Sequence, residues 1–246
     1  LLYALAPFLF PNNVYVGLLL GTVVFSVSAG LSEVLISPTV AAIPSKSQAH
    51  RYLICAALDD SPTTILCPDT NQDIEATADC LRALGADIRR TETGYTVTPI
   101  RVVPDAALLP CRESGSTLRF LLPIAGALGV DATFQMEGRL PQRPLSPLWE
   151  EMERMGCLLS RPTENTLRCT GKLRSGAYTI DGGVSSQFIT GLLFAHALLG
   201  GCSLTVTGKL FSSFTSSVRS CFVTEFTCLS GEIPESFTAT GIIFAG

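Results

Sequence analysis

Three stretches of the sequence decide the fold: SQAHRYLICAAL at 47–58, STLRFLLPIAGAL at 116–128 and SSQFITGLLFAHAL at 185–198. When they are aligned, their Ala-Leu pairs, which begin at 57, 127 and 197, fall at a constant spacing. Each stretch is long enough for about three helical turns and is apolar on nearly every face. A helix that is hydrophobic all round must be buried all round, so the sequence predicts three equivalent helices that bury one another.

The residues that follow each of these helices repeat as well. A short run of β-forming residues comes directly afterwards, at 63–68, 132–136 and 203–208. In the first two copies an amphipathic helix is expected next, within 73–88 and 144–159, and a glycine near its end serves as C-cap. Short alternating runs at 94–100 and 165–171 predict further strands. We therefore predict an α/β fold of repeated β-α-β-α-β-β units, used almost three times, that packs buried helices at the centre with sheets outside.

The composition excludes some classes of function. The net charge is −4 and the chain has no run of Lys or Arg, which argues against nucleic-acid binding, because that binding rests on clustered cations. The nine cysteines are odd in number and mostly lie in apolar runs, which is typical of reduced thiols in a cytosolic protein. The two histidines are far from any cysteine pair. We expect neither a metal ligated by this chain nor a cofactor.

The chain divides into three segments of different character. Residues 1–40 form an apolar, helical, transmembrane-like segment, and its uncharged run at 14–31 is long enough to cross a membrane, with a signal peptide or a buried core hairpin as alternatives. Residues 41–212 hold the repeats. Residues 213–246 are rich in Phe, Ser and Thr and show little periodicity, so this tail stays unassigned, with disorder and out-of-frame translation as its two explanations.

Polar residues recur at the start of each predicted buried helix. The three sets are Ser45, Lys46 and Ser47 with Arg51; Ser114, Gly115 and Ser116 with Arg119; and Ser185, Ser186 and Gln187. Free backbone N–H groups, the positive end of the helix dipole, hydroxyls and guanidinium groups together suit an anion. Simple capping by Ser is the alternative. Because burial of an unpaired cation is unfavourable, we expect Lys46 and Arg51 to face a ligand or a solvent-filled cleft.

A Pro-rich stretch, GRLPQRPLSPL at 138–148, adds two more cations. Arg139 and Arg143 lie in a turn before a predicted helix, where two fixed guanidinium groups suit a carboxylate or a phosphate. Salt bridges to the nearby glutamates Glu150, Glu151 or Glu153 are an equally good interpretation of the spacing.

Four of these motifs together resemble a known family. PSKSQAHR at 44–51, ESGSTLRFLLPIAG at 113–126, GRLPQRPLSPL at 138–148 and DGGVSSQFITGLL at 181–193 are similar, in that order, to the N-terminal half of the 5-enolpyruvylshikimate-3-phosphate synthases. The resemblance implies one domain of a two-domain cytoplasmic enzyme. This enzyme transfers the enolpyruvyl group of phosphoenolpyruvate to the 5-hydroxyl of shikimate 3-phosphate and needs no cofactor. At the other end, GLSEVLISPTVAAIPS at 30–45 is similar to a stretch of bacterial major-facilitator transporters.

The resemblance also implies roles for individual residues. Lys46 and Gln187 match residues that contact both substrates, and Gly115 and Arg143 match positions that bind phosphoenolpyruvate. The shikimate 3-phosphate set comprises Lys46, Ser47, Arg51, Ser185, Ser186, Gln187 and, at a less well aligned position, Ser212.

The family's catalytic acids and bases belong to its second domain, so the resemblance places no catalytic residue in 41–212. We therefore expect weak binding of shikimate 3-phosphate and negligible turnover by this chain alone. Two alternatives stay open at this point. The chain is a membrane-anchored or non-catalytic module that binds an anionic metabolite, with membrane contact if residues 1–40 are genuine, or it is a fusion that never folds stably.

Overall fold

The computed structural model describes residues 46–208, 222–227 and 236–244, with side chains described for 46–208. All of these residues belong to one unit of the chain, which runs from Ser45 to Gly246. The predicted apolar segment at 1–40, Ser45 and Ser212 lie outside the described residues. None of the described helices combines the length and the apolar character needed to cross a bilayer.

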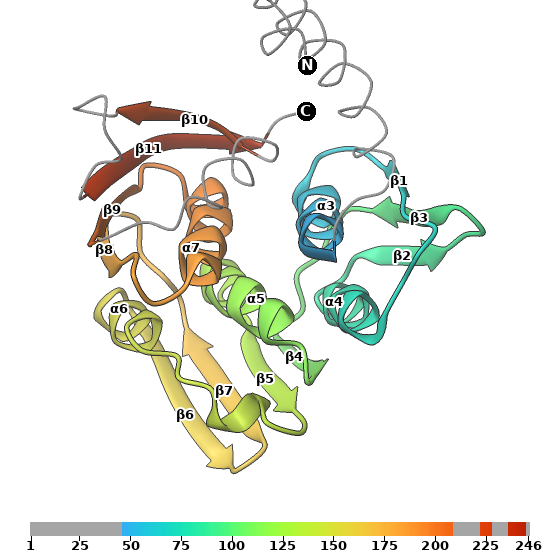
Figure 1. Ribbon diagram of the computed structural model, residues 1–246, viewed down its shortest axis with the longest axis horizontal. Helices are drawn as coiled ribbons and strands as arrows, with labels where there is room; N and C mark the ends of the chain where they lie inside the picture. The colour runs from blue at the N-terminus through green and yellow to red at the C-terminus, as the bar shows by residue number, and fades with distance from the viewer. Residues whose placement is uncertain (1–45, 209–221, 228–235, 245–246) are drawn as a thin grey trace, which may run out of the picture. The chain divides into compact units, whose positions relative to one another are not determined.

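The first repeat packs two helices against a three-stranded antiparallel sheet of order β1-β3-β2 (Figure 1). Its elements are α3 (Lys46–Leu58), β1 (Thr63–Leu66), α4 (Gln72–Ala83), β2 (Asp87–Arg90) and β3 (Gly94–Thr98). Helix α4 begins at the N-cap Asn71, whose side chain accepts hydrogen bonds from the backbone of Asp73 and Ile74. It ends at Leu84, and Gly85 follows with a φ of 106°, a conformation that glycine adopts without strain.

The second repeat has a mixed sheet of order β4-β5-β7-β6, in which β4 and β5 are parallel and joined by α5. Its elements are β4 (Ala106–Arg112), α5 (Gly115–Leu128), β5 (Asp131–Met136), the 3-10 helix η1 (Leu140–Gln142), α6 (Leu148–Arg154), β6 (Cys157–Thr163) and β7 (Thr166–Gly171). Helix α6 is shorter than the stretch 144–159 in which it was expected. Pro147 lacks an N–H and stands at the N-cap, where a proline is tolerated.

The third repeat has the same strand order as the second. Its sheet runs β8-β9-β11-β10, with β8 and β9 parallel and joined by α7. The elements are β8 (Ala177–Asp181), α7 (Ser186–Leu199), β9 (Ser203–Thr207), β10 (Phe222–Thr227) and β11 (Ser236–Phe244). The last two strands lie within the tail 213–246, which has no assignment from the sequence. Thr, Phe, Val and Ile are frequent in them, and β11 pairs with the otherwise open edge of β9.

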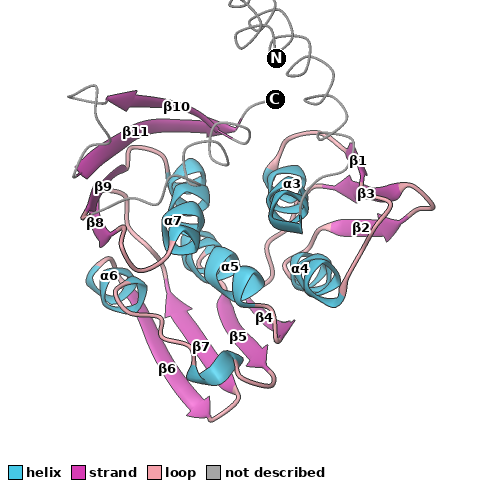
Figure 2. Ribbon diagram, in the orientation of Figure 1, coloured by secondary structure: helices cyan, strands magenta, loops and turns pink. Residues whose placement is uncertain are grey.

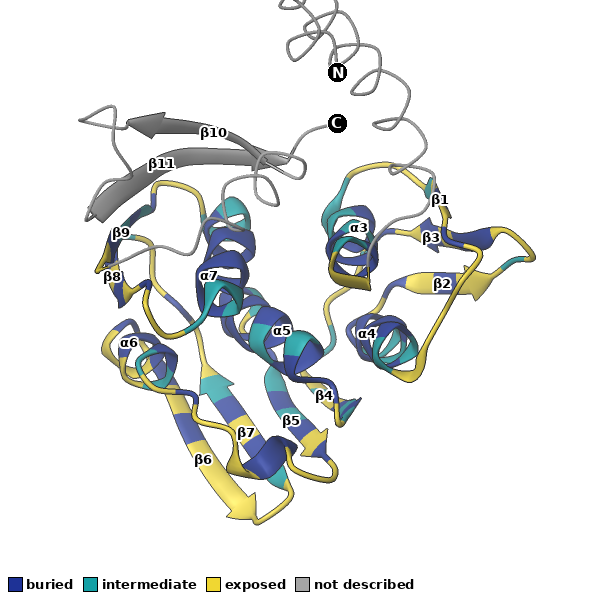
Figure 3. Cartoon of the chain, in the orientation of Figure 1, coloured by how far each residue is buried: buried dark blue, intermediate teal, exposed yellow. Residues whose placement is uncertain are grey.

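The three predicted buried helices, α3, α5 and α7, lie on the inner side of the sheets (Figure 2). Buried residues follow their inward faces and the inward faces of the strands, as Figure 3 shows. The predicted α/β architecture of repeated units is therefore confirmed for the described residues. Within them, β1 has no neighbour on the edge that β4 and β8 occupy in the other two sheets.

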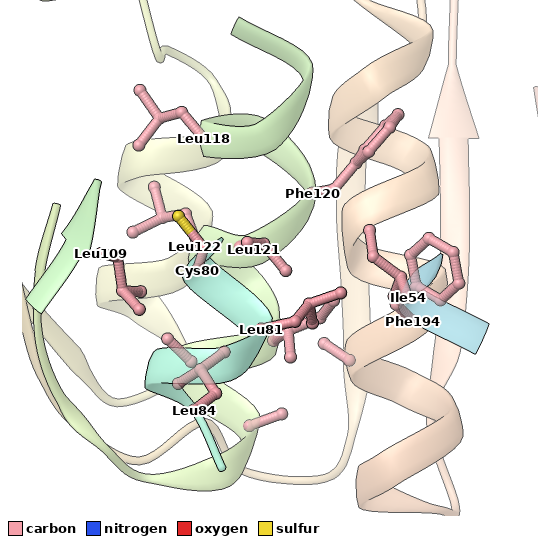
Figure 4. Close-up of a cluster of buried hydrophobic side chains, with 14 of the residues drawn as sticks. Ile54, Cys80, Leu81, Leu84, Leu109, Leu118, Phe120, Leu121, Leu122 and Phe194 are labelled. Atoms are coloured by element: carbon pink, nitrogen blue, oxygen red, sulfur yellow. The ribbon is translucent and has the colours of Figure 1, made fainter. Parts of the chain in front are cut away.

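The core is continuous across the helices. Leu81 and Leu84 of α4 pack with Leu109 of β4, while Phe120 of α5 points toward α7 (Figure 4). The rings of Phe120 and Phe194 meet edge to face, with centroids 6.3 Å apart. The described cysteines are free thiols and all but one are buried, as the sequence predicted.

Gly191 of α7 lies directly against the backbone of α5. A methyl group at this position would lie 2.3 Å from the carbonyl oxygen of Arg119, so no side chain fits. Pro123, four residues after Arg119, has no N–H to bond that carbonyl within α5. Gly191 therefore sets how closely α7 packs against α5, the helix that begins at Gly115.

Candidate functional site

The best-defined part of the site is the start of α5. Its N-cap, Ser114, is 1% exposed and accepts hydrogen bonds from the backbone N–H and the hydroxyl of Thr117, at 3.3 and 2.7 Å. The next residue, Gly115, opens the helix, where free N–H groups and the helix dipole favour an anion.

Two guanidinium groups lie against Gly115. A methyl group on Gly115 would be 2.8 Å from Nη1 of Arg119 and 2.8 Å from Nη1 of Arg143. In the part of the chain that the structure describes, neither guanidinium forms an ion pair with a carboxylate. Two like charges held together without an acidic partner are the arrangement that an anionic ligand would stabilise.

Arg119 also joins α5 to α7. Its Nη1 donates to Oε1 of Gln187 at 3.0 Å, and Nε2 of Gln187 donates to the hydroxyl of Ser116 at 2.7 Å. The guanidinium lies 5.6 Å from the ring centroid of Phe188. Burial, and then the charge of Arg143, lower the pKa of Arg119, but a guanidinium stays protonated at neutral pH. The pair thus keeps its positive charge.

The start of α3 carries a second set of polar residues. The buried Arg51 donates through Nη1 to the backbone carbonyl of Ser47 at 2.9 Å and also to its hydroxyl. Its guanidinium carbon lies 5.3 Å from the ring centroid of Phe120. Lys46 is exposed and pairs with Asp73 of α4, so its charge already has a partner in the protein. Ser47 and Arg51 share one helix face, as their spacing predicted.

The start of α7 is more open. Ser185 is the N-cap, and its hydroxyl accepts from the backbone N–H of Gln187 at 3.3 Å. Ser185, Ser186 and Gln187 are all half-buried. Just before them, Asp181 accepts from the backbone N–H of Gly183 at 2.8 Å, which shapes the approach to the helix.

Comparison with known proteins decides the family. A profile of the EPSP synthase family, that is 3-phosphoshikimate 1-carboxyvinyltransferase, matches residues 33–218. The chain belongs to the EPSP synthase family. The enzyme of this name from Clostridium kluyveri is 37% identical over 202 residues, and that from Clostridium beijerinckii is 40% identical over 172 residues.

The chain spans about half the length of the EPSP synthases that it matches. The alignments cover 80% of this chain but 47% of the Clostridium kluyveri protein, and 66% of this chain but 40% of the Clostridium beijerinckii protein. The fold is similar to that of EPSP synthase from Acinetobacter baumannii, with a TM-score of 0.64 and 20% identity over 83% of this chain and 48% of that one. The enolpyruvyl transferase NikO from Streptomyces tendae also has a similar fold. Its TM-score is 0.53 and its identity is 19%, over 81% of this chain and 47% of that one.

The structure brings together several residues that the EPSP synthase resemblance singled out. Gly115 and Arg143 are adjacent, and Gln187 reaches them through Arg119. The alternative salt bridges of the Pro-rich turn do not form among the described residues. Glu151 instead binds Arg154 through both carboxylate oxygens and accepts from the backbone N–H of Thr179.

Sequence reasoning left Arg119 out of the substrate-binding set, although it noted that Arg119 follows Ser116 by three residues. Its bond to Gln187 of α7 depends on how two helices pack, and no spacing within one helix reveals this. The same holds for Asp73, the partner of Lys46. No group of three or more His, Cys, Asp or Glu in the described ranges is arranged to hold a metal ion.

Proposed function

We propose that this domain binds phosphoenolpyruvate and shikimate 3-phosphate. In this proposal it forms one wall of the active site that transfers the enolpyruvyl group to the shikimate 5-hydroxyl. The observation that carries the proposal is the position of Gly115 between the guanidinium groups of Arg119 and Arg143, neither of which has a carboxylate partner among the described residues. Membership of the EPSP synthase family supplies the identity of the ligands.

Phosphoenolpyruvate fits the chemistry at the start of α5. It carries a phosphate and a carboxylate, and planar guanidinium groups can bind either one through paired hydrogen bonds. The missing side chain at Gly115 leaves its backbone accessible to a phosphate oxygen. In this arrangement Arg143 binds the anion directly, while Arg119, which Gln187 holds in place, adds charge from within the helix.

Shikimate 3-phosphate is assigned to the starts of α3 and α7. Ser185 and Ser186 offer hydroxyls and the dipole of α7 to the 3-phosphate, and Gln187 lies next to them, bonded to α5. Lys46, Ser47 and Arg51 are assigned to the ring and its carboxylate. Binding there requires Lys46 to share its charge between Asp73 and the ligand.

Binding and turnover are separate in this proposal. The reaction needs groups that remove the proton of the 5-hydroxyl and protonate the methylene carbon. We assign these groups to the half of the relatives' length that this chain does not span. The chain alone should therefore show no measurable turnover, and a steady-state rate near ~10 s⁻¹, a usual value for enzymes, would contradict this assignment.

Calorimetric titration of the full chain with each ligand tests the binding. We expect a Kd of about 1 mM for phosphoenolpyruvate and at least a tenfold loss with Arg143→Ala, because a direct charge-assisted bond disappears. Arg168→Ala is the matched control, since Arg168 is exposed and pairs with Asp131 on the β5–β7 sheet. The proposal fails if neither ligand binds, or if both variants weaken binding equally.

A further inference from the structure

The turn between β4 and α5 has an unusual backbone. Arg112, the last residue of β4, has a φ of 52°, and it is the one non-glycine residue with a positive φ in the described parts of the chain. The pairing of β4 with β5 shifts register between Pro110 and Arg112, and the Arg112 carbonyl accepts from the backbone N–H of Glu137 at 2.7 Å. A conformation that disfavours a side chain persists only where its surroundings hold it.

The side chain of Arg112 is held by α4. Its Nη2 donates to Oδ2 of Asp79 at 2.7 Å. The other carboxylate oxygen of Asp79 accepts from Nη1 of Arg82, also at 2.7 Å, so Asp79 itself is fixed within α4. One end of the turn is thus tied to the middle of that helix.

The other end of the turn is tied to the same helix by a chain of buried hydroxyls. The hydroxyl of Thr117 lies 2.7 Å from that of Ser114 and 2.7 Å from that of Thr77, and Nδ1 of His50 lies 2.6 Å from the Thr77 hydroxyl. All four side chains are buried. Ser114, at one end of this chain, directly precedes Gly115.

One direction of donation gives every bond of this chain a donor and an acceptor. If His50 carries its proton on Nδ1, it donates to Thr77, which donates to Thr117, which donates to Ser114. Nε2 of His50, which is buried without a hydrogen-bond partner, is then a bare lone pair, and an unpaired acceptor is tolerated better than an unpaired N–H. This direction of donation needs His50 to be neutral, and burial of the ring favours the neutral form.

We propose that α4 is the positioning element of the anion-binding turn. Thr77 and Asp79 touch no ligand, but Thr77 holds Ser114 through Thr117 and Asp79 holds Arg112, and so the two residues orient the Gly115 backbone. His50 of α3 forms the far end of the same chain of hydrogen bonds. The inference rests on the proposed function only for the identity of the anion.

Hydrogen exchange of the full chain tests positioning without any ligand. The backbone N–H groups of Ser114, Thr117 and Leu118 are bonded within the turn. With Thr77→Val, and separately with Asp79→Asn, we expect these amides to exchange about tenfold faster, as for the loss of one buried hydrogen bond, while the amides of α7 stay unchanged. Thr77→Ser keeps the hydroxyl and should restore protection.

Tyr95→Phe is the matched control. It also removes one hydroxyl that contacts α4, because Tyr95 donates to Glu75, but this contact faces β3 and not the turn. The variant should leave exchange in the turn unchanged. The inference is overturned if Thr77→Val and Asp79→Asn affect the turn no more than Tyr95→Phe does. If Thr77→Val does not fold, Asp79→Asn and Thr77→Ser carry the test.

Ligand binding by the same variants separates this inference from the proposed function. We expect Thr77→Val to weaken phosphoenolpyruvate binding about fivefold and shikimate 3-phosphate binding less than twofold, a difference that a general loss of stability would not produce. Equal losses for both ligands would overturn the positioning role. If the unmodified chain binds no phosphoenolpyruvate, the proposed function fails, and the exchange data alone decide the inference.

Discussion

Helices α5 and α7 start in the same way, but the surroundings of their first residues differ. Each follows a serine N-cap whose hydroxyl accepts a backbone N–H, as their equivalent places in the repeat predict. The cap of α5 is buried and tied to α4, and two guanidinium groups face the residue after it. The cap of α7 is half-buried, and its cationic neighbour, Arg119, comes from α5. The repeat therefore supplies caps and dipoles, whereas the charge that selects an anion comes from elsewhere, in particular from Arg143.

The largest effect should come from acid, through two buried histidines, His50 of α3 and His196 of α7. Burial lowers the pKa of His50 and of His196 from 6.5 to about 4, although Asp73 and Glu151, respectively, act in the opposite direction. Lys46 and Arg51 lower the pKa of His50 further. Both rings are thus neutral in the folded protein and protonated more readily when it unfolds.

The stability that these histidines contribute is present above pH 6.5 and is lost as the pH falls from 6.5 through about 4. The full loss is roughly 3 kcal/mol per histidine. Urea unfolding followed by circular dichroism at several pH values should show this slope, and His50→Gln or His196→Phe should each remove part of it. A free energy of unfolding that stays constant between neutral pH and about pH 4.5 would contradict the prediction.

The next largest effect should be on binding. Gly115→Ala places a methyl group 2.8 Å from both guanidinium groups and should weaken phosphoenolpyruvate binding more than tenfold, or more than about 1.4 kcal/mol. Gly183→Ala, before α7, meets Asp181 at 3.2 Å and should change this binding less than about twofold. Calorimetry on both variants checks the contrast. Similar losses would mean that the two helix starts contribute equally to binding this ligand.

The smallest contrast should be between the two serine caps. Ser114→Ala removes the acceptor of the buried Thr117 N–H and the nearer acceptor of its hydroxyl, and should lower the free energy of unfolding by about 2 kcal/mol. Ser185→Ala removes one half-buried acceptor and should lower it by about 0.5–1 kcal/mol. Thermal or urea unfolding measures both. Equal losses would show that burial and the contact with α4 add nothing to the cap of α5.

The sequence predicts much of this fold because its signals are local. The apolar stretches that become α3, α5 and α7 indicate both a helix and its burial. The β-forming runs that follow them become β1, β5 and β9. Strands β10 and β11 escaped prediction because their pairing depends on the free edge of β9, which lies far away in sequence.

The candidate site was also predictable only as far as its signals are local in the sequence. The polar residues at each helix start and Arg143 of the Pro-rich turn follow from local sequence, and the family resemblance added the ligand that each would bind. The contacts of Arg119 with Gln187 and of Arg112 with Asp79 join separate elements, so no local pattern contains them. The positive φ of Arg112 could not be foreseen either, because arginine is not a residue that usually adopts it.

Because α7 lies so close to α5 at Gly191, mutations at this position should have an unusual effect. Any other residue there would push α7 away from the carbonyl of Arg119. Gln187 lies one turn earlier on α7, so it would move as well. A mutation at Gly191 would therefore first appear as a loss of affinity, although the altered residue faces the interior. Genetic screens for binding defects in this domain would recover position 191 together with exposed arginines such as Arg143, and the loss of affinity alone would not distinguish the two groups of mutants.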